Sequence, residues 1–108
     1  LADLVAEPQV WQGVQALRRD LFREPLSPRE LGRYAALVID PPRAGARAQM
    51  DAIAQSAVPV VISVSCNSAT FARDAAILCA GGYAFERAQI IDQFTFSHHV
   101  EMVGVFSR

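Results

Sequence analysis

Lysine is missing from this sequence, and all ten basic residues are arginine. A biased genome composition explains such a preference without any function. Arginine also suits phosphate and base recognition, because its planar fork can form two parallel hydrogen bonds. The composition leaves both explanations open. The formal net charge is −1, which excludes a bulk electrostatic attraction to nucleic acid.

Long apolar runs are missing as well. The longest, near residues 35–39, is only a few residues long, whereas crossing a bilayer takes roughly 20. The first residues show neither a basic start nor a signal-like apolar segment. We therefore expect a soluble, cytoplasmic protein that does not contact a membrane.

Cysteine is scarce. Two thiols, Cys66 and Cys79, give neither a disulfide scaffold nor a zinc framework. His98 and His99 are adjacent and point in different directions, and the sequence shows no third ligand near them, so we expect no metal site. What is abundant is apolar character: 52% of the 108 residues are hydrophobic, enough for the core of one domain.

The hydrophobic pattern predicts an α/β domain, because strand-like and helix-like segments alternate along the chain. We expect a mostly parallel sheet with helices on both faces. The last strand should be antiparallel, since residues 92–100 are too few for a crossover helix. The expected strands cover 13–17, 35–39, 58–64, 83–92 and 100–106, and the expected helices cover 27–33, 45–56 and 68–80. The apolar run at 35–39 is typical of a strand buried on both faces.

Chemically capable residues follow the predicted strands. Asp20, Asp40 and Cys66 with Asn67 each come at such a strand end, and ligands of open parallel sheets bind outside the carboxyl ends of the strands. The two prolines after Asp40 would form a rigid lip beside a pocket. Asp40 is equally suited to form a turn and cap the next helix, and the sequence leaves both interpretations open.

Cys66 lies at the junction of a predicted strand and a predicted helix. A helix N-terminus stabilises a thiolate through its dipole and its free amides, and a thiolate is what nucleophilic catalysis needs. The alternative is a buried, unreactive cysteine, which is common in proteins. We expect that second state for Cys79, late in a helix beside apolar neighbours. Glu101 is either a solvated carboxylate or a functional one.

Three motifs in register resemble those of the RNA 5-methyluridine (uracil-C5) methyltransferase family. Their nucleophile motif is similar to residues 64–74, which read VSCNSATFARD. Their strand-end motif resembles DPPRAG at 40–45, and their general-base motif resembles HHVE at 98–101. A weaker upstream motif matches DLF at 20–22, so that the resemblance covers roughly residues 20–108.

The resemblance implies the C-terminal part of a Rossmann-like class I methyltransferase, with S-adenosyl-L-methionine as cofactor and structured rRNA or tRNA as substrate. It implies that Cys66 adds to C6 of uracil and that Glu101 is the general base. The cofactor would contact Asp20 and Asp40. The RNA would contact Asp40, Arg43 and Asn67.

Two departures from the family pattern bear on function. Ser68 stands where the family usually has proline, and serine is also a good residue at a helix start. The glycine-rich cofactor loop and the acidic residue for the cofactor ribose are missing. We therefore expect the upstream half of the same protein to complete the cofactor site, and the isolated chain to be inactive. Two alternatives are an exocyclic-amine nucleic-acid methyltransferase and a non-catalytic Rossmann-like module that binds RNA or protein.

Overall fold

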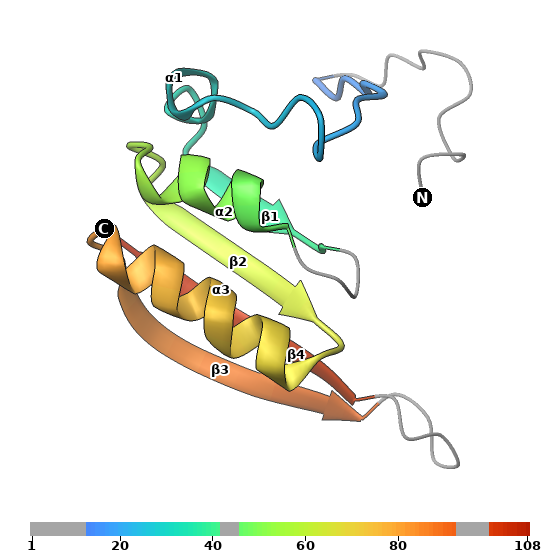
Figure 1. The fold of residues 1–108 in the computed structure, drawn as a ribbon, viewed down its shortest axis with the longest axis vertical. Coiled ribbons are helices and arrows are strands. Elements are labelled where there is room, and N and C mark those ends of the chain that lie inside the picture. Colours follow the sequence, from blue (N-terminus) through green and yellow to red (C-terminus); the bar gives the residue numbers. More distant parts are fainter. Residues whose placement is uncertain (1–12, 42–45, 93–99) are drawn as a thin grey trace.

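The computed structural model describes residues 13–41, 46–92 and 100–108 (Figure 1). Helices and strands alternate through most of this part, as the hydrophobic pattern predicts. In chain order the elements are α1 (Pro28–Leu31), β1 (Ala36–Ile39), α2 (Arg47–Ala54), β2 (Val60–Ser65), α3 (Ser68–Ala80), β3 (Ala84–Asp92) and β4 (Val100–Ser107). No helix in this described part has the length and apolar character that a membrane span needs.

The four strands form one sheet in the order β1-β2-β4-β3. β1 is parallel to β2, whereas β4 is antiparallel to both of its neighbours, β2 and β3. The predicted antiparallel last strand is therefore confirmed. Three strands run in one direction, but because β4 lies between two of them, the sheet is mixed in its pairing, and only β1 and β2 pair in parallel.

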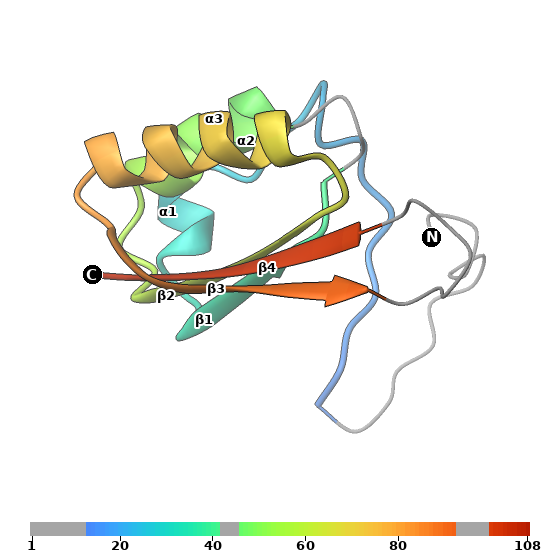
Figure 2. The ribbon, with the colours of Figure 1, turned by 90° about the horizontal axis from the view of Figure 1, so that it is seen from below.

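The described helices lie on one side of the sheet (Figure 2). α2 and α3 pack against each other there, and α3 also contacts β2, β3 and β4. Burial in β2 alternates accordingly, with Val61, Ser63 and Ser65 buried and the residues between them half-buried. The expectation of helices on both faces is wrong for the described residues. Strand–helix alternation predicts crossovers, but it does not say which face each helix covers.

Capping residues explain where α1 and α3 begin. Ser27 and Glu30 form a capping box at α1: the Ser27 hydroxyl accepts from the Glu30 amide at 3.1 Å, and the Glu30 carboxylate accepts from the Ser27 amide at 3.2 Å. Asn67 caps α3, which ends at Gly81. Residues 68–80 were predicted as a helix with these boundaries, and α3 confirms them.

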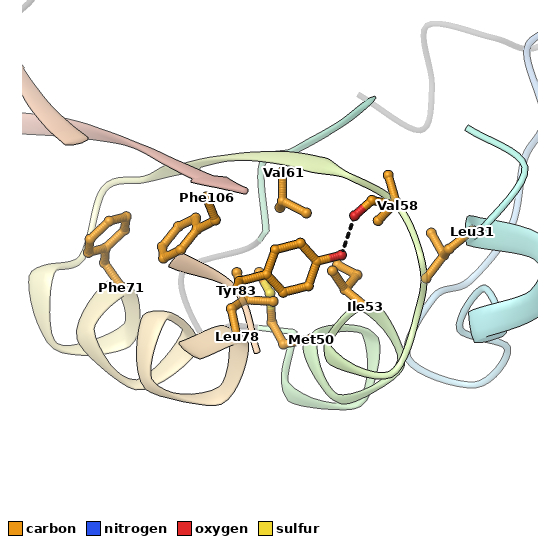
Figure 3. Close-up of a cluster of buried hydrophobic side chains, with 9 residues drawn as sticks. All are labelled: Leu31, Met50, Ile53, Val58, Val61, Phe71, Leu78, Tyr83 and Phe106. Carbon is orange, nitrogen blue, oxygen red and sulfur yellow. Dashed lines mark hydrogen bonds between the residues drawn. The ribbon is translucent and has the colours of Figure 1, made fainter. Parts of the chain in front are cut away.

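The core lies between the helices and the sheet (Figure 3). Its buried side chains are Leu31, Met50, Ile53, Val58, Val61, Phe71, Leu78, Tyr83 and Phe106. Tyr83 is the polar member of this set, and its hydroxyl donates to the carbonyl of Val58 at 2.6 Å. This bond joins the start of β3 to the residues that lead into β2.

Two local predictions are wrong. Residues 13–17 form no strand, and Val14 makes only an isolated bridge. β1 is a strand of the sheet as predicted but is not buried on both faces, because it lies at the edge of the described sheet and Val38 is 65% exposed. An apolar run indicates a strand, but it does not show whether other segments cover it.

Candidate active site

Three of the predicted functional residues lie at one edge of the sheet. Since β1 and β2 are parallel, both end at the same edge, and the antiparallel β4 begins there (Figure 1). Asp40 directly follows β1, Cys66 directly follows β2, and Glu101 is the second residue of β4. The sequence predicted that Asp20, Asp40 and Cys66 each follow a strand, and Asp40 and Cys66 do so.

The strand register places Cys66 and Glu101 at the same end of one strand pair. Ser65 pairs with Met102, the last pair of the β2–β4 ladder. Cys66 directly follows Ser65 and leaves the strand in a bend, and Glu101 directly precedes Met102 in β4. The ladder therefore joins the immediate neighbours of the two candidate residues.

A compact turn holds Cys66 in place. The hydroxyl of the preceding Ser65 is buried, donates to the carbonyl of Asn67 at 3.0 Å and accepts from its amide at 3.2 Å. These two bonds bridge the residue between them, so the Cys66 backbone is tied at both ends. The Cys66 side chain itself is exposed. The thiol is therefore presented to solvent from a fixed backbone.

Asn67 acts here as a helix cap. Its side-chain oxygen accepts from the amides of Ala69 at 3.0 Å and of Thr70 at 3.2 Å. These two amides are therefore not available to a thiolate, and the support that α3 gives Cys66 comes from the helix dipole. Because these two hydrogen bonds occupy the side-chain oxygen, any side-chain contact between Asn67 and a substrate would use the side-chain nitrogen.

Asp20 does not follow a strand, contrary to the expectation from sequence. It begins a turn, in which its carboxylate accepts from the amide of Phe22 at 3.0 Å and its carbonyl accepts from the amide of Glu24 at 2.8 Å. Leu21 and Phe22 line a small apolar cavity of about 30 Å³ with the first residues of α2. Asp20 thus lies near the start of α2, the helix that follows Asp40 in the chain.

Gln49 was not singled out from sequence, yet it fixes this turn segment to α2. Its buried side chain accepts from the amide of Leu26 at 2.8 Å and donates to the carbonyl of the same residue at 3.0 Å. A glutamine beside Met50 on the buried face of α2 is the signal that could have indicated such a contact.

Asp74 was also missed. It lies in α3, only 2% exposed, and one carboxylate oxygen has no hydrogen-bond partner. Burial raises its pKa, and the nearby Arg73 guanidinium, 3.7 Å away, opposes that rise. Cys79, in contrast, was expected to be buried and is exposed. It follows Leu78 in the helix, and one step of an α-helix turns it away from the core.

Arg43, His98 and His99 fall outside the described residues. Within the described ranges, no three His, Cys, Asp or Glu side chains gather as a metal ion would require. The chemistry on offer at the sheet edge is therefore a thiol, two carboxylates and the dipole of α3.

A family model described as tRNA (uracil-5-)-methyltransferase matches residues 12–108. The chain belongs to this family. Among curated proteins, this chain is 56% identical over 91 residues to an uncharacterized RNA methyltransferase of Brucella suis, and the match covers 84% of this chain and 22% of that protein. It is 43% identical over 75 residues to the 23S rRNA (uracil(1939)-C(5))-methyltransferase of Acinetobacter baumannii, covering 69% and 16%.

The structure is similar to the crystal structure of the Pyrococcus abyssi tRNA (uracil-54, C5)-methyltransferase in complex with S-adenosyl-L-homocysteine. The TM-score is 0.60 at 32% identity, over 68% of this chain and 18% of that one. The chain thus spans about a fifth of the length of the relatives it matches. Family membership fits the mixed α/β sheet and the order of the three motifs.

Proposed function

We propose that this chain is the catalytic part of an enzyme that methylates C5 of uracil in RNA, with Cys66 as nucleophile and Glu101 as general base. The observation that carries the proposal is the β2–β4 register, whose last pair, Ser65 with Met102, joins the neighbours of these two residues at one end of the strand pair. Membership in the uracil-5-methyltransferase family supports it.

The chemistry needs a nucleophile and a base on one small ring. A target uridine leaves the RNA fold and enters the site. The Cys66 thiolate forms a bond to C6, and the electron pair of the C5=C6 bond moves toward C5. C5 of uracil is otherwise a poor nucleophile, so this addition activates it. After C5 has gained its methyl group, Glu101 takes the C5 proton, the double bond forms again and the bond from C6 to sulfur breaks.

S-adenosylmethionine, when bound, supplies an electrophilic methyl group. The described residues fit part of this cofactor: Asp20 lies beside the exposed apolar side chain of Phe22, an arrangement suited to adenosine, and the exposed Asp40 lies at the sheet edge. The chain offers no glycine-rich loop for the methionine end. We assign Asp20 and Asp40 to the cofactor, and the upstream part of the protein to the rest of its site.

The RNA side of the site is assigned to the same edge. Asp40 lies between the cofactor and the base in this proposal. Arg43 follows it in the sequence and would contact the base or a phosphate. Asn67 contributes through its amide nitrogen, because its side-chain oxygen caps α3. We assign structured RNA of the ribosomal or transfer class as the substrate, because the relatives named above are a 23S rRNA and a tRNA methyltransferase.

Covalent trapping in the full-length protein tests the proposal. The Glu101→Gln change keeps the size of the side chain but removes the base, so addition and methylation proceed while elimination stalls. Methylated RNA should then stay attached to Cys66, visible as a shifted band on a denaturing gel and as a modified peptide in mass spectrometry.

Two cysteine variants complete the test. Cys66→Ala should abolish both the adduct and 5-methyluridine formation, whereas Cys79→Ala, at the other exposed thiol, should change neither. A Glu101→Gln enzyme with normal turnover would remove Glu101 from the mechanism. If Cys66→Ala protein still methylates an exocyclic amine of the RNA, the result would favour an exocyclic-amine methyltransferase, whose chemistry needs no cysteine.

A further inference from the structure

Gly104 is a point of close approach between α3 and the sheet. It lies in β4, where it pairs with Ser63 of β2 and Ala88 of β3. A methyl group built on Gly104 would lie 2.5 Å from Cζ and 2.7 Å from Cε2 of Phe71. No Cβ atom tolerates carbon neighbours at those distances, so any side chain here must displace the phenylalanine ring.

The ring of Phe71 has little room to move aside. It is 6% exposed and packs against the stacked pair of Phe85 and Phe106, whose ring centroids are 6.4 Å and 6.3 Å away. The methyl group would also come within 3.2 Å of the Phe106 ring. A side chain at Gly104 would therefore displace the first turns of α3 from β4 rather than rotate one ring.

This contact joins the elements that carry the two proposed catalytic residues. Phe71 donates its amide to the carbonyl of Asn67 at 2.9 Å, and Asn67 follows Cys66 directly. On the other side of the contact, Gly104 lies three residues from Glu101 in the same strand. A shift of α3 away from β4 would therefore pull on the turn that holds Cys66, while Glu101 stays in β4.

We propose that Gly104 is a positioning residue for uracil methylation: because it has no side chain, Phe71 packs directly on β4, and this packing sets the distance between Cys66 and Glu101. The inference rests on the proposed function. A Cβ atom at Gly104 would lie 2.5 Å from Cζ of Phe71, whereas ordinary contact begins at 3.4 Å, so α3 would have to move by about 1 Å. A misplacement of about 1 Å lowers catalytic rates by up to roughly 100-fold.

The readout is the decay of the covalent adduct in a single turnover of the full-length protein, sampled by quenching in denaturant and resolved on a gel. The first-order rate constant of that decay does not depend on how much enzyme is folded, so a loss of stability lowers only the amount of adduct. We expect Gly104→Ala to slow the decay by roughly 10- to 100-fold.

Compensation and a matched control separate positioning from stability. Phe71→Leu shortens the opposing side chain and should also slow the decay, whereas the Phe71→Leu/Gly104→Ala pair should return close to the wild-type rate constant. Gly81→Ala is an equally severe clash, 2.6 Å from the Ala54 carbonyl oxygen, at the far end of α3. It should reduce the amount of adduct and leave the rate constant unchanged.

The outcomes distinguish this inference from the proposed function. If wild-type protein forms no adduct that depends on Cys66, the proposed function fails. If the adduct forms but decays at the wild-type rate in Gly104→Ala, or Gly81→Ala slows it as much, the positioning inference alone is overturned. Should Gly104→Ala not fold, a wild-type decay in Phe71→Leu overturns it equally.

Discussion

The hydroxyl of Tyr83 offers a clean test of the core on which the sheet edge is built. It is buried, with the tyrosine 3% exposed, and donates to the Val58 carbonyl at 2.6 Å (Figure 3). Tyr83→Phe removes this one oxygen and keeps the ring, over which the Arg108 guanidinium lies at 3.9 Å. The carbonyl then stays buried without the partner that Tyr83 provides.

Leaving a buried acceptor unsatisfied costs about 1–3 kcal/mol. Since every 1.4 kcal/mol changes an equilibrium constant tenfold, the equilibrium constant for the opening of β2 and β3 should rise by about 5- to 150-fold. Hydrogen exchange of the full-length protein, read by mass spectrometry on peptides from these strands, measures that ratio.

The chain contains a matched control for this change. Tyr34 is its second tyrosine and is 54% exposed, so Tyr34→Phe removes a hydroxyl that water already serves. Its effect should stay within about 0.5 kcal/mol. If both variants exchange alike in β2 and β3, the hydroxyl of Tyr83 contributes nothing and the reasoning fails.

Three further predictions concern charge, thiols and the isolated chain. Burial raises the pKa of Asp74, so this carboxyl holds a proton more tightly in the folded than in the unfolded protein, and the free energy of unfolding should rise as the pH falls from that raised pKa toward 3.8. Asp74→Asn should remove this pH dependence and stabilise the protein at neutral pH by on the order of 1 kcal/mol, as measured by urea unfolding at several pH values. Iodoacetamide at neutral pH should label Cys66 before Cys79, and because both thiols are exposed, faster labelling of Cys79 would show that the start of α3 does not activate its neighbour. The isolated chain should bind S-adenosylmethionine very weakly, and it should self-associate through the sheet face and edge that the described helices leave open. Micromolar affinity in calorimetry together with monomeric behaviour in sedimentation would contradict this prediction.

Local signals in the sequence predicted local structure well. The predicted helix at 68–80 coincides with α3, which Asn67 caps, and the predicted helix at 27–33 contains α1, which begins at the capping box of Ser27 and Glu30. These signals work because one side chain satisfies specific amides of its own first turn. The two closing strands followed for a similar reason, since a short connection permits only an antiparallel return.

Burial was harder to predict, because it depends on segments far away in the chain. Val38 lies in an apolar run, yet it is exposed at the edge of the described sheet. Cys79 has apolar neighbours in sequence, but it lies on the solvent side of α3. Asp74 is the reverse case, a charged residue turned into the buried face. Composition near a residue does not fix its direction on a helix.

The candidate site is predictable to the extent that it depends on strand order. That Asp40 and Cys66 share an edge follows from two parallel strands, each ending where its apolar run ends. That Glu101 lies at the same end of the strand pair as Cys66 follows from the register of β4 against β2, and no pattern in either segment specifies that register. Gly104 supplies part of the missing information, because only a residue without a side chain lets Phe71 pack on β4. In our proposal, the distance between the two catalytic candidates depends on this contact in the core, which lies three residues from Glu101 and five from Cys66.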